Sequence, residues 1–133
     1  MTIMTDLFFR RIVAGAVVIV AGMWTPTVLA HAMLVKSEPP RRATLVKSPT
    51  QIKLWFNEEV EKDYASLTLL DANKTPVTDV KPRLAPEDAR AIELSLPELA
   101  PGKYSVKFRV LSVDGHVVDS VYDFTVKPKP DLK

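Results

Sequence analysis

Two histidines are the residues of this 133-residue chain that are best suited to bind a metal. His31 lies in the first quarter of the chain, and His116 ends the tripeptide that begins at Asp114. Imidazole nitrogens and carboxylate oxygens suit copper(II), which stands highest in affinity among the divalent first-row ions. The chain has no cysteine. A thiolate site is therefore excluded, and only nitrogen, oxygen and thioether ligands remain.

The segment before His31 has the features of a signal peptide. Arg10 and Arg11 end a short basic region, and residues 12–24 form an uncharged, mostly apolar run that is too short for a full bilayer span. Compact residues precede the favoured cleavage site between Ala30 and His31. We therefore expect residues 1–30 to form a signal peptide that is removed on export.

Two other interpretations of this segment stay open. An uncleaved anchor could use part of the uncharged stretch 12–35, although Pro26 interrupts it. The adjacent Arg10 and Arg11 also invite a twin-arginine interpretation, but such pairs are common in ordinary export signals. Ordinary export followed by cleavage is the better prediction, and it makes His31 the first residue of the mature protein.

A histidine at a free N-terminus offers an α-amine and a ring nitrogen, which together can close a low-strain chelate ring on a metal ion. On its own, a histidine after a signal peptide is usually coincidence. Asp114 and His116 would point to the same side if their backbone were extended. Alternatively, Asp114 and Gly115 form a hairpin-turn signal, which leaves His116 exposed after the turn. The two interpretations are compatible, since a turn can carry ligands.

The elements that must position these residues are predicted to be β-strands. Apolar and polar residues alternate along 51–57 and 104–110, as half-buried strands require. A short first strand near His31 should end in the proline-containing loop 37–40. Further strand-like runs cover 64–70, 91–96 and 117–126.

The strand pattern predicts an all-β fold, an immunoglobulin-like or cupredoxin-like Greek-key β-sandwich of about seven strands. The only candidate helix is a brief piece over residues 86–90. Removal of residues 1–30 leaves 103 residues, which is enough for one domain over 31–127. The Pro- and Lys-rich tail 128–133 is expected to be frayed.

The net charge of the mature protein gives no support to a polyanionic partner. The removed segment carries two of the 18 basic and one of the 16 acidic residues, so the net charge falls from +2 to about +1. Such a balance gives no electrostatic reason to bind nucleic acid or an anionic membrane surface.

Several motifs, taken in order, resemble the CopC family of periplasmic copper-binding proteins. Each motif is weak alone, but their order and spacing are specific, and they span nearly the whole mature chain. The resemblance lies in His31-Ala32 with the Ser-Glu-Pro-Pro stretch downstream, and in the segments 54–58, 101–110 and 112–116.

This resemblance implies a site for one Cu(II) ion. His31 would bind through its amine and ring, and Asp114 and His116 would complete the coordination. Glu58 aligns with an acidic residue that lies near the metal in this family, in the outer shell. Glu58 also begins the charged run 58–63, and most such runs are simply solvated.

Some features depart from the family's pattern. Certain relatives carry a methionine-rich segment for Cu(I), but Met33 is the only methionine left after cleavage, so Cu(I) binding is not implied. Glu59 stands where a proline is usual and Ser120 where a glycine is common, so the local loop geometry could differ. The proposed ligand positions are intact.

The leading functional hypothesis is a periplasmic copper carrier or buffer, a monomer without enzymatic activity that could pass copper to an inner-membrane transporter resembling CopD. One rival is a copper-dependent oxidative enzyme, because lytic polysaccharide monooxygenases also chelate copper with an N-terminal histidine. Asp114 argues against it, since a carboxylate would fill a position that oxygen activation needs. The other rival is a metal-free structural or adhesion β-sandwich.

Overall fold

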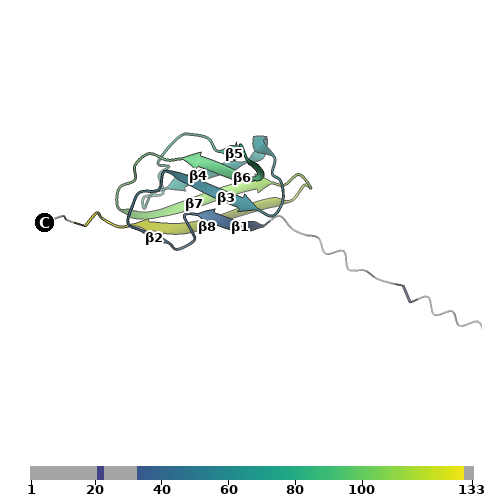
Figure 1. Cartoon of the computed structure of the whole chain (residues 1–133), viewed down its shortest axis with the longest axis horizontal. Helices are drawn as coiled ribbons and strands as arrows, with labels where there is room; N and C mark the ends of the chain where they lie inside the picture. Colours follow the sequence, from purple (N-terminus) through teal and green to yellow (C-terminus); the bar gives the residue numbers. More distant parts are fainter. Residues whose placement is uncertain (1–20, 23–32, 131–133) are drawn as a thin grey trace, which may run out of the picture.

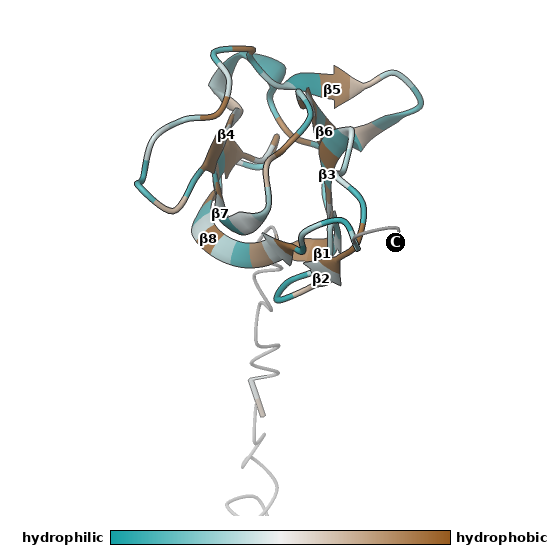
Figure 2. Cartoon of the chain, turned by 90° about the vertical axis from the view of Figure 1, so that its left-hand side faces the viewer, coloured by the Kyte–Doolittle hydropathy of each residue, from teal (hydrophilic) through white to brown (hydrophobic). Residues whose placement is uncertain are grey.

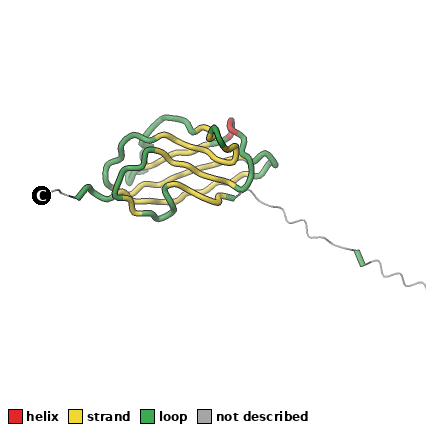
Figure 3. The backbone as a smooth tube through the Cα atoms, in the orientation of Figure 1, coloured by secondary structure: helices red, strands yellow, loops and turns green. Residues whose placement is uncertain are grey.

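Two four-stranded sheets make up the fold in the computed structural model, which describes residues 21–22 and 33–130. One sheet has the strand order β1-β3-β6-β5 and the other has the order β2-β8-β7-β4 (Figures 1 and 3). The elements are β1 (Leu34–Glu38), β2 (Thr44–Leu45), β3 (Gln51–Phe56), the 3₁₀ helix η2 (Lys62–Tyr64), β4 (Ser66–Leu70), β5 (Arg83–Ala85), β6 (Asp88–Ser95), β7 (Gly102–Leu111) and β8 (Val117–Val126).

The two sheets face each other across a single apolar core, which Figure 2 shows from one end. The chain passes from one sheet to the other after β1, β2, β3, β4 and β6, as expected for a Greek-key sandwich. All strand pairs are antiparallel except the short pairing of β2 with β8. The predicted β-sandwich is therefore confirmed, with eight strands rather than about seven in the described chain.

Alternating side chains explain why the core forms. In β3, Ile52, Leu54 and Phe56 are buried, whereas the residues between them face outward. On β7, Phe108 is buried and meets Phe56 edge to face, with ring centroids 5.9 Å apart. In β3, β4 and the second half of β8, apolar residues on every second position are buried, which is the pattern of a half-buried strand.

The helix predicted over residues 86–90 is wrong. Residues 86 and 87 form a tight turn between β5 and β6, and residues 88–90 already belong to β6. Pro86 fixes φ at a value that suits the first central position of a β-turn, and Ala85 and Ala91 are buried on either side. A second, smaller difference is that the strand predicted from residue 64 begins at Ser66, after η2.

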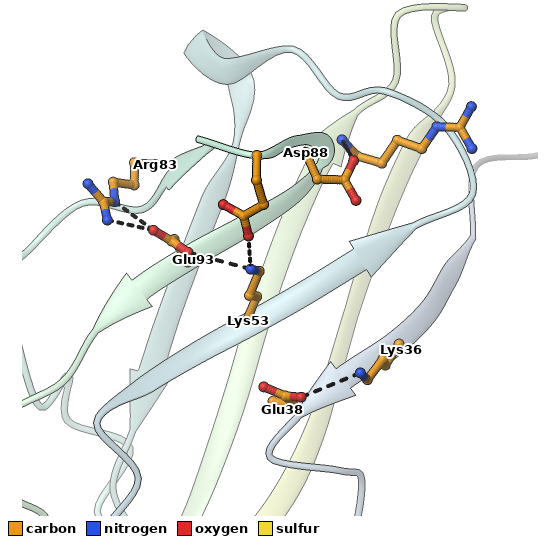
Figure 4. Close-up of polar contacts among 8 residues, drawn as sticks. Lys36, Glu38, Lys53, Arg83, Asp88 and Glu93 are labelled. Carbon is orange, nitrogen blue, oxygen red and sulfur yellow. Dashed lines mark hydrogen bonds and ion pairs between the residues drawn. The ribbon is translucent and has the colours of Figure 1, made fainter. Parts of the chain in front are cut away.

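The outer face of the β1-β3-β6-β5 sheet carries paired charges around Trp55. Amines of Lys36 and Lys53 lie 4.6 Å and 5.0 Å from the centroid of the Trp55 ring. Figure 4 shows Lys53 pointing toward Glu93, which also receives two contacts from Arg83. The carboxylate of Glu93 is therefore paired with two cations, those of Lys53 and Arg83.

Four segments that are separated in the sequence lie together at one end of the sandwich. The start of β1, the end of β3, η2 and the β7–β8 connection lie together at the right-hand end of Figure 1, opposite the C-terminus. Within residues 21–22 and 33–130, no helix is long and apolar enough to cross a membrane. The proposed cleavage site and His31 fall outside the described residues.

Candidate metal centre

The β7–β8 connection is a tight hairpin loop that carries Asp114 and His116. The two strands pair without interruption up to Leu111 and Val117. The Ser112 N–H donates to the His116 carbonyl (2.8 Å), and the Gly115 N–H donates to the Ser112 carbonyl (2.9 Å). Gly115 has φ +93°, a conformation that favours glycine. The predicted turn is therefore confirmed, although His116 is half-buried rather than exposed, and the backbone from Asp114 to His116 is not the extended strand that the other interpretation assumed.

The turn nevertheless brings the carboxylate and the imidazole together. Nδ1 of His116 lies 3.0 Å from Oδ1 of Asp114, and each side chain keeps about a third of its surface exposed. The same carboxylate oxygen accepts the backbone N–H of His116 (3.3 Å). The loop thus places a carboxylate and an imidazole side by side, with both side chains partly exposed although the Nδ1 atom itself is buried.

Ser112 holds this loop together through its side-chain hydrogen bonds, a role that its place in the sequence does not indicate. Its hydroxyl is buried, donates a hydrogen bond to Oδ1 of Asp114 and accepts the backbone N–H of His116 (3.2 Å). The hydrogen bond from Ser112, followed by that from His116, holds the pKa of Asp114 well below its ordinary value. Asp114 is therefore a carboxylate over the whole physiological range.

Glu58 joins the same cluster from the end of β3. It is half-buried, and its hydrogen bond with Asp114, together with burial and the negative charge of Asp114, raises the pKa of Glu58. His116 and Arg90 act in the opposite direction. Two adjacent carboxyl groups and an imidazole thus converge at this end of the sandwich. A bound cation would reduce the charge repulsion between the carboxyl groups of Glu58 and Asp114.

Backbone hydrogen bonds fix the distance between the Glu58 segment and the hairpin loop. The Val113 N–H donates to the Glu59 carbonyl (3.0 Å), and Val60 forms an isolated antiparallel bridge with Ser112. Glu59 therefore supplies a contact to the loop through its carbonyl. This pairing holds Glu58 beside Asp114.

The described residues supply only part of a metal site. Among residues 21–22 and 33–130, no three histidine or acidic side chains are arranged so that they could hold an ion by themselves. The remaining predicted ligand, His31, lies outside these residues, and the first described residue after it is Met33. Met33 is hydrogen-bonded to Asn57, the residue just before Glu58.

Comparison with known proteins identifies one matching family and several solved structures with a similar fold. The family model for the CopC domain matches residues 34–127. The chain is 30% identical over 125 residues to copper resistance protein C of Xanthomonas campestris pv. juglandis, an alignment that covers 90% of this chain and 98% of the relative.

Two solved structures resemble this fold over their whole lengths or nearly so. The crystal structure of CopC from Methylosinus trichosporium OB3b superposes with a TM-score of 0.71 at 40% identity, covering 77% of this chain and 100% of that one. The structure of PcoC, a methionine-rich copper resistance protein from Escherichia coli, gives 0.65 at 28% identity, covering 74% and 100%.

Proposed function

The chain belongs to the CopC family, and we propose that its mature form binds one Cu(II) ion between His31 and the β7–β8 loop. The observation that carries the proposal is the convergence of Asp114, His116 and Glu58 at one end of the sandwich. Relatives named for copper resistance support the choice of copper.

His31 is the ligand that would complete the site. It lies two residues before Met33, and two residues of extended chain span at most about 7 Å. Met33 is tied to Asn57, whose neighbour Glu58 contacts Asp114. The α-amine and ring of His31, the imidazole of His116 and the carboxylate of Asp114 would then form a nitrogen- and oxygen-rich set that suits Cu(II). Glu58 would stay in the outer shell and orient Asp114.

The donor set favours Cu(II) over Cu(I). Cu(I) prefers soft thiolate or thioether ligands, but the chain has no cysteine, and Met33 would be the only methionine after cleavage at His31. One relative of similar fold is described as methionine-rich. This chain differs from it in that respect, because no methionine follows Met33.

The mature protein would act as a periplasmic carrier or buffer rather than as an enzyme. Asp114 stands beside His116 and would occupy a coordination position that oxygen activation requires. The carrier would be a monomer that delivers copper to an inner-membrane transporter resembling CopD. The near-neutral charge of the mature chain is consistent with a partner other than nucleic acid or lipid.

Titration with metal ions tests the proposal directly. We expect the mature protein to bind one equivalent of Cu(II) and to hold it far more tightly than Zn(II) or Ni(II), since Cu(II) heads the divalent series. Trp55, the only tryptophan after residue 30, provides a fluorescence signal. Absence of Cu(II) binding would support a metal-free sandwich, whereas peroxide formation with a reductant would support the oxidative enzyme.

Copper affinity should fall as the pH falls. Imidazole and an α-amine have ordinary pKa values of about 6.5 and about 7.7 to 8.0, and Cu(II) must displace a proton from each protonated donor. Affinity should therefore drop by about tenfold per pH unit for each donor nitrogen that is protonated. Protonation of Asp114 should not contribute to this pH dependence above pH 5, because the pKa of Asp114 is lowered and its carboxyl group is already ionised. Competition titrations between pH 5 and 9 measure the slope, and a flat profile would contradict nitrogen ligation.

A further inference from the structure

Asn57 holds the residue from which the chain leads back to His31. Its side-chain Oδ1 accepts the backbone N–H of Met33 (2.7 Å), and its own backbone N–H donates to the Met33 carbonyl (3.0 Å). Both main-chain polar groups of Met33 are thus bound by one residue. The side chain of Met33 is exposed and contributes little anchoring, so these two hydrogen bonds fix its position.

A β-bulge lies in β1 just after Met33. Leu34 pairs with Phe56, whereas Lys36 pairs with Trp55, so Val35 is an extra residue in β1. A bulge bends its strand and re-aims the residues beyond it. Beyond the bulge, the side chain of Asn57 supplies a hydrogen bond that a standard antiparallel pairing does not contain.

The residues after Asn57 reach the other half of the proposed site. Glu58 contacts Asp114, and the carbonyl of Glu59 accepts the N–H of Val113 (3.0 Å). Three consecutive residues therefore bind the start of β1 on one side and the β7–β8 loop on the other. The separation between these two segments is set by this short stretch of backbone.

We propose that Asn57 is a positioning residue that holds the chain leading to His31 beside the Asp114 loop, so that the N-terminal chelate is pre-organised for the metal. This inference rests on the copper site proposed above. Asn57 does not bind the ion in this scheme. It acts through Met33, and it reduces the loss of chain entropy that closing the site would otherwise require.

Three variants of the mature protein test this role. Asn57→Ala removes the acceptor for the Met33 N–H, and Asn57→Asp keeps an acceptor oxygen in its place. Ser48→Ala is the matched control, because Ser48 Oγ accepts a backbone N–H from Leu99 at the same distance of 2.7 Å, at the far end of β3. Each alanine variant thus loses one side-chain acceptor of a backbone N–H.

Hydrogen exchange in the metal-free protein gives the first measurement. The Met33 amide should exchange faster in Asn57→Ala than in the wild type, and Asn57→Asp should restore its protection. Ser48→Ala should leave the Met33 amide unchanged. A Met33 amide that is equally protected in Asn57→Ala and the wild type would overturn the proposal, since the side-chain hydrogen bond would then not hold this residue.

Copper affinity gives the second measurement. Loss of one hydrogen bond should weaken Cu(II) binding by about three- to tenfold in Asn57→Ala and not in Ser48→Ala. In a chain with Met added before His31, where the amine is displaced, Asn57→Ala should cause little further loss. Equal losses in both alanine variants, or the same loss with and without the added Met, would overturn the positioning role.

The outcomes separate the two proposals. If the wild-type mature protein does not bind Cu(II), the proposed function is wrong, and the positioning role fails with it. If the wild type binds Cu(II) and Asn57→Ala binds it equally well, only the role of Asn57 is wrong. The paramagnetic resonance spectrum of the Cu(II) form should keep its nitrogen count in Asn57→Ala, because no ligand is removed.

Discussion

A mature chain that carries one extra Met before His31 should fold normally and lose most of its Cu(II) affinity. The extension converts the α-amine of His31 into an amide nitrogen and moves the new amine away from the chelate position. Each tenfold loss of affinity corresponds to about 1.4 kcal/mol, and loss of a strong donor together with its chelate ring should cost several such steps. The paramagnetic resonance spectrum should show one fewer equatorial nitrogen.

The control is the same chain beginning at His31, released by a protease that leaves no extra residue. Circular dichroism should be the same for both proteins, because an added residue at a chain terminus is well tolerated. Equal affinities and identical spectra would show that the amine is not a ligand. Intact mass of the exported protein would establish separately whether the natural chain starts at His31.

Replacement of His116 by Ala should abolish tight Cu(II) binding without unfolding the protein. Changes to groups that merely orient a ligand typically cost about 10- to 100-fold in metal affinity, so removal of a ligand should cost more than about 100-fold. The backbone of His116 accepts from Ser112 and donates to Ser112 and Asp114, and alanine keeps these hydrogen bonds. The hairpin should therefore persist.

Asp119→Ala is a matched control on the same hairpin. Asp119 pairs with Arg109 on the exposed face at 3.5 Å, an ion pair of the kind that contributes little to stability. This variant should bind Cu(II) as the wild type does. Unaltered affinity in His116→Ala would place the site elsewhere in the molecule, and a similar loss in both variants would indicate a nonspecific effect of the hairpin surface.

The fold was predictable where one strand face is buried and the other is exposed. In β3, Ile52, Leu54 and Phe56 repeat with a period of two, and the structure buries all three. Residues 86–90 gave no such pattern, because two turn residues and the first three residues of β6 are too few positions for a period to appear. Their strand character comes from the hairpin with β5, in which Asp88 pairs with Ala85 across the two-residue turn.

The site was predictable only in part, for a similar reason. Asp114 and Gly115 carry a local turn signal, and the structure confirms the turn and the contact between Asp114 and His116. Ser112 and Asn57 have no such signal. Ser112 acts through a buried hydroxyl, and Asn57 acts on a residue 24 positions away, so only the folded backbone reveals their contacts.

The described segments on either side of the proposed site lead into opposite layers of the sandwich. Met33 leads into β1, at the edge of one sheet, whereas Asp114 and His116 lie on the hairpin of the other sheet. An ion bound by both segments would cross-link the two sheets in a chain that has no cysteine for a disulfide. Copper binding would then raise the free energy of unfolding of the sandwich, since a ligand bound only by the folded state stabilises that state. Release of the metal would loosen the same edge strand from which it departs.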